Sequence, residues 1–394
     1  MRTKCVIAAA GAVALLLAGC GGESDEASRP AGGEQQPPAE TPVSERPTIL
    51  TVAAAGDLLV HEQLTEQAAE DAAASGQPGH DFSQVLAGIA PVVEAADLAI
   101  CHLEQPLAEP SGPFTGWPLF SAPPQLADAA AAAGFDTCST ASNHSLDTEF
   151  AGIVRTLDNL DRVGIAHHGT ARDEYEAQTP NIVDVRGVPV AQLSYTTSFN
   201  GLQLPEDKPW AANALDPQRI LADAQQAREA GAEIVILSLH WGTEYQVDPD
   251  PDQLALAEQL LASPDVDLIV GHHVHVVQPF EKIGDEWVAY GMGNLTARFP
   301  DGSPENTQDA VVPTFTFQEV QPGQWRVVEV SAVATWMEYY PQARVVNLPA
   351  ALSDRNLPDD QRDRYQAAFD RITEYVDQRG ALDDGLTLVQ PVDH

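Results

Sequence analysis

Three histidines stand within four residues at the end of a short apolar run. The run, residues 266–270, is typical of a buried strand, and Gly271 separates it from His272, His273 and His275. In α/β proteins ligands bind at the carboxyl ends of strands, so these imidazoles are expected to face a crevice. Imidazole nitrogens at such a place suit zinc, iron or manganese ions. This turn therefore predicts a site for a divalent metal ion.

Four other apolar runs also end in polar side chains that could join this site. The predicted strands are 49–55, 97–103, 135–141 and 234–239, and the polar residues that follow them are Asp57, Glu104, Asn143 and His240. One such side chain means little, because buried strands commonly end in a polar residue. Together, carboxylate, amide and imidazole groups are the mixed ligands that paired divalent ions take. Six residues are thus predicted to bind metal: Asp57, Glu104, Asn143, His240, His273 and His275.

His144 follows the predicted ligand Asn143 directly. An imidazole at that place can stabilise a transition state or protonate a leaving group. Asp147 comes three residues later and would orient the imidazole if the backbone turned helical there. A helix cap is an equally good interpretation of Asp147. We predict His144 and Asp147 as the catalytic side chains.

The elements that must hold these side chains alternate between strand and helix. Helical patterns cover residues 81–95, 125–133, 150–163, 216–230 and 251–262. This alternation predicts parallel βαβ units. Further patterns indicate hairpins within 181–195 and 280–290, long alternating strands at 311–320 and 325–335, and a polar helix at 358–378. The predicted fold class is α/β with a second sheet rich in antiparallel strands.

The N-terminal residues have the character of a processing segment. Positive charges at Arg2 and Lys4 precede an apolar stretch at 6–17 that is too short for a good membrane span. Leu17-Ala18-Gly19-Cys20 resembles the bacterial lipoprotein signal, which implies removal of residues 1–19 and a lipid on Cys20; an ordinary secretory signal is the alternative. Residues 20–47 are rich in Pro, Gly, Glu and Ser and are predicted to be a disordered tether. The domain follows at 48–394, with a core at 48–340 and a helical tail at 350–394.

Acidic residues dominate the charge balance. The chain has 58 Asp and Glu against 20 Lys and Arg, a net charge of −38. Such a field repels nucleic acid, which we exclude as a partner. Cys101 and Cys138 each lie within a predicted strand. We favour two buried free thiols over a disulfide, because strand cysteines often serve as small core residues.

Six motifs carry a resemblance to a known family. They are Gly56-Asp57, Leu103-Glu104-Gln105-Pro106, Ser142-Asn143-His144-Ser145-Leu146-Asp147, His240-Trp241-Gly242-Thr243-Glu244-Tyr245, Gly271-His272-His273-Val274-His275 and Gly293-Asn294. Over about residues 48–299 their order and spacing resemble the CapA family, which is linked to poly-γ-glutamate capsule synthesis. The resemblance implies a calcineurin-like metallophosphoesterase fold, a four-layer sandwich of two mixed β-sheets flanked by helices.

The resemblance also implies how two divalent ions, of manganese, iron or zinc, would be held. Asp57 would bind one ion, Asn143 and His240 the other, and Glu104 would bridge both. Paired divalent ions polarise a phosphoryl or carbonyl oxygen and generate a nucleophile at neutral pH.

The histidine turn matches the family only in part. A Gly-His-x-His turn in calcineurin-like enzymes supplies one histidine to each ion, and His273 and His275 fit that pattern. His272 is the second choice, and His61 stays open as a further ligand. Where the family usually has asparagine this chain has His102, and residues 166–169 hold additional histidines. We interpret the histidines at both departures as surface or core residues.

We predict an extracytoplasmic, lipid-anchored protein of poly-γ-glutamate or capsule biosynthesis. As a metal-dependent hydrolase or transferase, it would act on an anionic polymer or a phosphate ester, with a capsule synthase membrane complex as a further partner. Because the net charge repels a polyanion, the metal ions and arginines such as Arg298 would have to attract it. Two alternatives remain: a general surface metallophosphoesterase, and a non-catalytic component that anchors or exports polymer.

Overall fold

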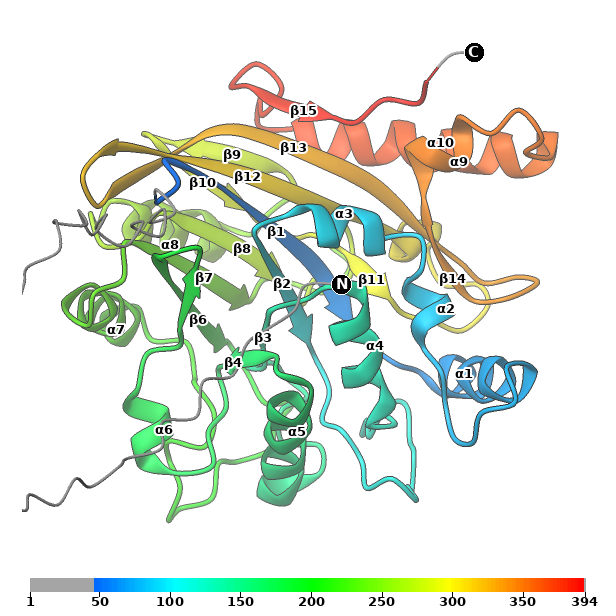
Figure 1. Cartoon of the computed structure of the whole chain (residues 1–394), viewed down its shortest axis with the longest axis horizontal. Coiled ribbons are helices and arrows are strands. Elements are labelled where there is room, and N and C mark those ends of the chain that lie inside the picture. The colour runs from blue at the N-terminus through cyan, green and yellow to red at the C-terminus, as the bar shows by residue number, and fades with distance from the viewer. Residues whose placement is uncertain (1–45, 393–394) are drawn as a thin grey trace, which may run out of the picture. The chain divides into compact units, whose positions relative to one another are not determined.

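The strands form two mixed sheets, here called the first and second sheet (Figure 1). A computed structural model describes residues 46–392, so the predicted signal peptide, Cys20 and nearly all of the tether lie outside the described residues. The first sheet has the order β14-β13-β12-β1-β2-β3-β4, with β11 beside β1 and β15 beside β13. The second has the order β5-β6-β7-β8-β10-β9.

The strand bounds are as follows. In the first sheet they are β1 (Ile49–Leu58), β2 (Leu98–Leu103), β3 (Thr137–Ser139), β4 (Ala166–His168), β11 (Asn294–Thr296), β12 (Asp309–Gln321), β13 (Gln324–Glu338), β14 (Arg344–Asn347) and β15 (Leu386–Leu388). In the second they are β5 (Ile182–Val185), β6 (Val188–Thr196), β7 (Ile234–His240), β8 (Leu268–His272), β9 (Phe280–Ile283) and β10 (Glu286–Ala289).

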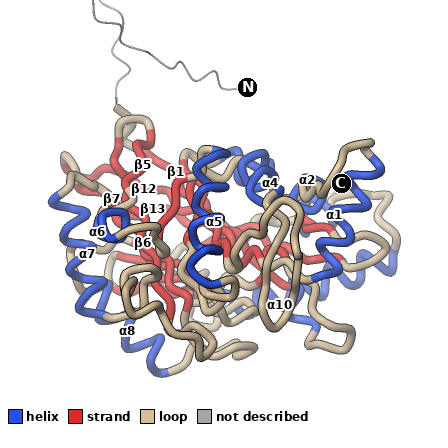
Figure 2. Tube along the Cα trace, turned by 90° about the horizontal axis from the view of Figure 1, so that it is seen from below, coloured by secondary structure: helices blue, strands red, loops and turns tan. Residues whose placement is uncertain are grey.

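The helices lie outside the sheets (Figure 2). Their bounds are α1 (Glu62–Ala74), α2 (Ser83–Leu86), α3 (Ala90–Ala95), α4 (Gln125–Ala133), α5 (Glu149–Val163), α6 (Glu174–Gln178), α7 (Pro217–Glu229), α8 (Pro251–Leu261), α9 (Leu348–Leu352) and α10 (Asp359–Asp377), with a 3₁₀ turn at Glu305–Gln308. Within residues 46–392, no helix is both long and apolar enough to cross a bilayer.

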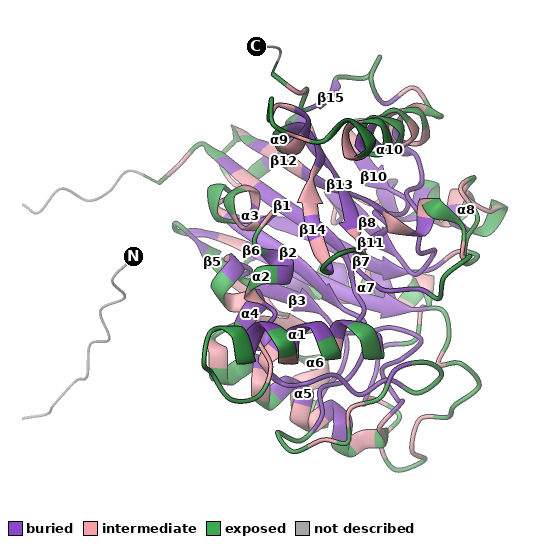
Figure 3. Ribbon diagram, turned by 90° about the vertical axis from the view of Figure 1, so that its right-hand side faces the viewer, coloured by how far each residue is buried: buried purple, intermediate pink, exposed green. Residues whose placement is uncertain are grey.

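The alternation of side chains along β1 explains the layers. Val52 and Ala54 face the second sheet and join a core that includes Ile236 and Val270. Ala53 and Ala55 point the other way, into a core shared with α1 to α5. The far face of the second sheet packs on α7 and α8. Figure 3 shows the buried strands between helices whose outer faces are exposed. This confirms the predicted architecture of two mixed sheets flanked by helices.

Most predicted elements form, and the exceptions have local causes. The hairpins β5–β6, β9–β10 and β12–β13 are antiparallel as predicted. The predicted helix at 81–95 is divided into α2 and α3, and Pro91 occupies the first turn of α3, where proline is favoured. Sequence analysis did not predict α1, whose buried face consists largely of alanine and polar residues.

Cys101 and Cys138 form a disulfide, so the prediction of two free thiols is wrong. The two residues are directly paired in the parallel register of β2 and β3, with their Cα atoms 4.5 Å apart. A separation of this size lies within the range that a disulfide spans. The bond joins two strands that lead toward the candidate site.

Replacing Arg371 of α10 with Met is expected to lower the free energy of unfolding by about 3 kcal/mol at pH 7.5. Arg371 Nε and Nη2 donate to the fully buried carboxylate of Asp309 at 2.6 and 2.8 Å. Burial raises the pKa of Asp309 to about 6 despite Arg371, so the folded state binds more protons than the unfolded state between about pH 4 and 6. Stability from this group therefore falls as pH rises through that window, and the cost of removing Arg371 should shrink below pH 6.

Urea unfolding at pH 7.5 and pH 5 measures this effect. Arg379→Met is the matched control, because its partner Glu281 is partly exposed and the loss should be about 1 kcal/mol or less. Equal losses for Arg371→Met at both pH values would contradict the prediction.

Candidate metal centre

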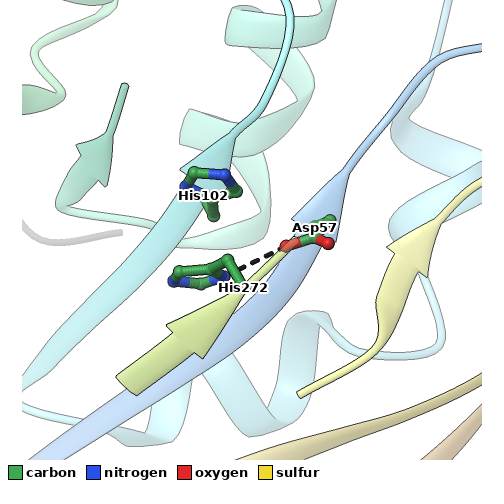
Figure 4. A group of neighbouring side chains, drawn as sticks. All are labelled: Asp57, His102 and His272. Carbon is green, nitrogen blue, oxygen red and sulfur yellow. Dashed lines mark hydrogen bonds and ion pairs between the residues drawn. The ribbon is translucent and has the colours of Figure 1, made fainter. Parts of the chain in front are cut away.

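Strand ends from both sheets meet in the interior. β1 and β2 run parallel in the first sheet, and β7 and β8 run parallel in the second. Their carboxyl ends bring Asp57 of β1, His102 of β2 and His272 of β8 together. Figure 4 shows the His272 ring directed toward the Asp57 carboxylate, with His102 beside it.

Two groups of buried side chains could each hold a metal ion. The first consists of Asp57, His102 and His272, and the second of Asp57, Glu104 and His275. In each group the possible ligand atoms lie within 4.8 Å of one another. Asp57 belongs to both groups and is therefore the carboxylate placed to bridge them.

Asp57 is held as a charged carboxylate. His272 Nδ1 donates to its Oδ1 at 3.1 Å, and the His273 backbone N–H donates to Oδ2 at 3.3 Å. His275 Nδ1 lies 3.4 Å from Oδ2. Burial favours the protonated form, but the contacts with His272 and His275 hold the pKa of Asp57 well below its usual value. Asp57 therefore carries a negative charge at neutral pH.

Glu104 provides the test of whether a cation fits. Its side chain is fully buried, and neither carboxylate oxygen has a hydrogen-bond partner. His275 Nε2 lies 3.7 Å from Oε1, beyond hydrogen-bond distance. Burial raises the pKa of Glu104 well above its usual value. A buried carboxyl group without partners is costly, and a divalent ion would supply the missing contact. The residues present fit a metal ion.

Four side chains form a hydrogen-bonded chain that includes His102 of the first group. His102 Nε2 and His240 Nδ1 are 2.9 Å apart, and His240 Nε2 lies 3.0 Å from Asn143 Oδ1. At the other end, His102 Nδ1 lies 2.7 Å from the Ser139 hydroxyl. Burial holds the pKa of His102 and of His240 well below its usual value, so both imidazoles are neutral near pH 7. Neutral imidazole is the form that binds metal.

The histidine turn is held in a strained backbone conformation. His273 and His275 have φ angles of 89° and 58°, in the left-handed region that side chains other than glycine rarely adopt. Asn294 Oδ1 lies 2.9 Å from His275 Nδ1, and Asn294 Nδ2 donates to the His275 carbonyl at 3.0 Å. Strain of this kind persists where surrounding contacts enforce it and is concentrated at functional sites.

His144 and Asp147 form a pair beside the two groups. His144 Nδ1 donates to Asp147 Oδ2 at 2.6 Å, and the Phe120 backbone N–H donates to the same oxygen at 2.7 Å. The N-cap of α5 is Thr148, which leaves Asp147 outside the cap position. Of the two interpretations of Asp147, the geometry therefore supports the orienting role.

A family model described as "Bacterial capsule synthesis protein PGA_cap" matches residues 51–298, which is more than half of the chain. The chain belongs to this family. Two relatives show the extent of the similarity. The capsule biosynthesis protein CapA of Bacillus anthracis is 28% identical over 195 residues, 49% of this chain and 47% of that protein. The PGA biosynthesis protein CapA of Bacillus subtilis (strain 168) is 29% identical over 203 residues, 50% of each chain.

This PGA_cap family member thus spans about half the length of these two relatives. Among solved structures, the calcineurin-like phosphoesterase YfkN from Bacillus subtilis gives a TM-score of 0.43. The sequence identity is 13%, over 84% of this chain and 99% of that chain.

In this PGA_cap family member the ligand groups differ from the predicted division. Asp57, rather than Glu104, is shared between the two groups. His272, the second choice, belongs to a group, whereas His273 does not; its ring centroid lies 4.5 Å from that of His240. His240 is also outside both groups and contacts the first through His102, and Asn143 Oδ1 lies 3.0 Å from His240 Nε2.

His102 is the site residue that sequence analysis interpreted as structural. It is directly paired with Asp57 across β1 and β2, and its ring stacks on His272 with centroids 4.0 Å apart. The replacement of the family's usual asparagine by histidine at this position was the feature of the sequence that could have indicated a ligand. Its place in the alternation of β2, opposite in direction to Leu103, was compatible with facing the centre.

Two further predicted residues have other roles in this family member. His61 lies outside both ligand groups, and its Nδ1 accepts from the Arg298 backbone N–H at 3.3 Å. The Arg298 guanidinium donates to the Phe299 carbonyl, Asp301 and the Tyr340 hydroxyl. With its hydrogen bonds used in this way, Arg298 is not the free anion-binding arginine that the sequence suggested.

Proposed function

We propose that this chain is a metal-dependent phosphoesterase that acts in poly-γ-glutamate or capsule biosynthesis at the outer face of the cell membrane. The observation that supports it best is the pairing of two buried ligand groups through Asp57, next to the oriented imidazole of His144. The lipoprotein-like sequence around Cys20 supports the membrane-anchored location. The names of the two CapA relatives support the capsule setting.

Two divalent ions of manganese, iron or zinc are proposed as the cofactors. One ion would be held by Asp57, His102 and His272, and the other by Asp57, Glu104 and His275. The ligands would be oriented by His240, Asn143 and Asn294. Ions bound there would polarise a phosphoryl oxygen and provide a nucleophile at neutral pH. Hydrogen bonds that orient metal ligands typically affect affinity or activity by about 10- to 100-fold.

The chain's own side chains supply the proton chemistry. In the pair with Asp147, His144 carries its proton on Nδ1, which leaves Nε2 available to the substrate. When protonated, Nε2 can donate to the oxygen of the leaving group as its bond to phosphorus breaks. The hydrogen bond to Asp147 fixes the plane of the ring.

Metal analysis followed by turnover tests this function. The full chain, reconstituted separately with manganese, iron and zinc, is expected to bind about two ions per chain and to hydrolyse bis-p-nitrophenyl phosphate or p-nitrophenyl phosphate. Chelator-treated protein is the control. Absence of bound metal would contradict the proposed centre. Bound metal and bound polyglutamate without turnover of any ester would favour the non-catalytic anchoring role instead.

A further inference from the structure

A pocket opens outward from the metal centre. It has a volume of about 340 Å³, and its inner end is formed by His61, His144 and His275. The pocket is thus continuous with one ligand group and with the proposed proton donor. Any group attached to a substrate beside the reacting bond would lie in it.

The inner wall of the pocket is aromatic. Phe120 contacts the rings of His61 and His144, with centroids 5.2 and 4.7 Å away. Phe299 contacts His61 and His275, with centroids 5.0 and 5.5 Å away. Both phenylalanines belong to a small apolar cluster of their own, separate from the main cores. The cluster therefore stabilises the wall of the pocket and is not part of the core between the two sheets.

The outer rim is apolar and exposed to solvent. Trp117 is 78% exposed, Leu119 50%, Tyr245 46% and Leu202 38%, and all four line the pocket. These side chains come from three separate segments, so local sequence composition does not explain their meeting. Apolar surface gathered at the entrance of a polar centre marks a place where a ligand binds. We call the four rim residues with Phe120 and Phe299 the aromatic mouth.

The charges at the pocket favour an uncharged occupant. Among the described residues that line it there is no lysine or arginine, and Glu244 is the one carboxylate. Arg298 lies close by, but its guanidinium is bound to Asp301 and Tyr340. An anionic group at the outer rim of the mouth would meet the Glu244 carboxylate with no lysine or arginine side chain lining the pocket to compensate it.

Tyr245 is fixed in place by its backbone. Its φ angle of 65° lies in the left-handed region, and its N–H donates to the carbonyl of Val274, between the two histidines of the turn, at 2.7 Å. The ring contacts His275 and Phe299, with centroids 5.9 Å away in each case. A strained residue that carries an exposed ring at this place indicates a binding role.

We infer that the aromatic mouth binds an uncharged apolar or aromatic group carried by the phosphoester next to its reacting bond, and that it disfavours further anionic groups. This inference rests on the proposed function and specifies its substrate class. It implies that a polyanionic chain binds poorly in the mouth, even though the two relatives are named for capsule or PGA biosynthesis.

Binding of two phosphonates to the metal-loaded full chain tests the inference. By calorimetry, benzylphosphonate is expected to bind about tenfold more tightly than methylphosphonate, because only the benzyl group buries apolar surface in the mouth. Trp117→Ala and Tyr245→Ala should each reduce this ratio at least about threefold, because they weaken the binding of benzylphosphonate more than that of methylphosphonate. Tyr175→Ala is the matched control, since Tyr175 is an 80% exposed aromatic residue outside this pocket.

A third phosphonate tests the claim that the mouth disfavours anionic groups. 4-Carboxybenzylphosphonate extends a carboxylate into the mouth, away from the metal centre, and should bind more weakly than benzylphosphonate. Glu244→Gln should reduce this difference in affinity. Equal affinities for benzyl- and methylphosphonate, unchanged in the variants, would overturn the inference while the phosphoesterase function stands. Binding of none of the three phosphonates would overturn both.

Discussion

Replacing Asp57 with Asn is expected to remove both metal ions and to lower phosphoester turnover by about a thousandfold or more. Asp57 is the residue common to the two ligand groups, and its carboxylate is kept ionised by contacts with His272 and His275. Asparagine preserves the shape of the side chain but provides neither the charge nor a second anionic oxygen. The loss should therefore affect both ions together.

Metal content per chain by elemental analysis distinguishes this role from that of Glu104. Glu104→Gln should remove or weaken only the ion of the second group, leaving about one ion per chain. Asp97→Asn is the matched control, because Asp97 directly precedes β2 at the opposite end of the strand from Glu104 and is bound to Thr51 and Arg186. Circular dichroism checks that each variant is folded. If Asp57→Asn retained both ions with undiminished affinity, Asp57 would not be the bridging carboxylate.

The sequence predicted which strands end in side chains of the candidate site, because each of these strands is a short apolar run followed by polar residues. The ends of β1, β2, β7 and β8 could be located in this way, and with them Asp57, Glu104, His240 and the histidine turn. Local patterning is enough for such a prediction, since the carboxyl ends of parallel strands lie at one edge of a sheet.

How the ligands are shared could not be predicted from local patterns. The position of Asp57 between His272 and His275 depends on how β1 of the first sheet lies against β8 of the second. No periodicity along one strand reports on that packing. The left-handed backbone conformation of His273 and His275 could not be predicted either, because it is accompanied by contacts with Asn294 and Asp57, which lie far away in the sequence.

The disulfide between Cys101 and Cys138 could not be predicted from local patterns either. The sequence pattern predicts each cysteine to be a core residue of its own strand, and both are buried. Only the register of β2 against β3 places Cys101 opposite Cys138. Alternation along a strand gives the face on which a side chain lies, whereas register between strands decides its neighbour.

Replacing His144 with Ala is expected to lower turnover by about 10²- to 10⁴-fold without loss of metal. His144 belongs to neither ligand group, but it lines the pocket that opens from the centre and is oriented by Asp147 at 2.6 Å. Asp147→Asn should reduce turnover less, since the imidazole remains while its charged partner is lost. Glu149→Gln is a neighbouring control, because Glu149 is exposed and comes two residues after Asp147.

The identity of the leaving group separates the possible roles of His144. A general acid is needed most when the departing alkoxide is basic, so His144→Ala should lose far more activity on an alkyl phosphoester than on the p-nitrophenyl ester. Equal losses on the two esters would indicate that the imidazole stabilises charge on the phosphoryl group and does not transfer a proton. Unchanged turnover on both esters would exclude His144 from catalysis, and the proton donor would then have to be sought among the other side chains that line the pocket, where His61 and Tyr245 are the candidates.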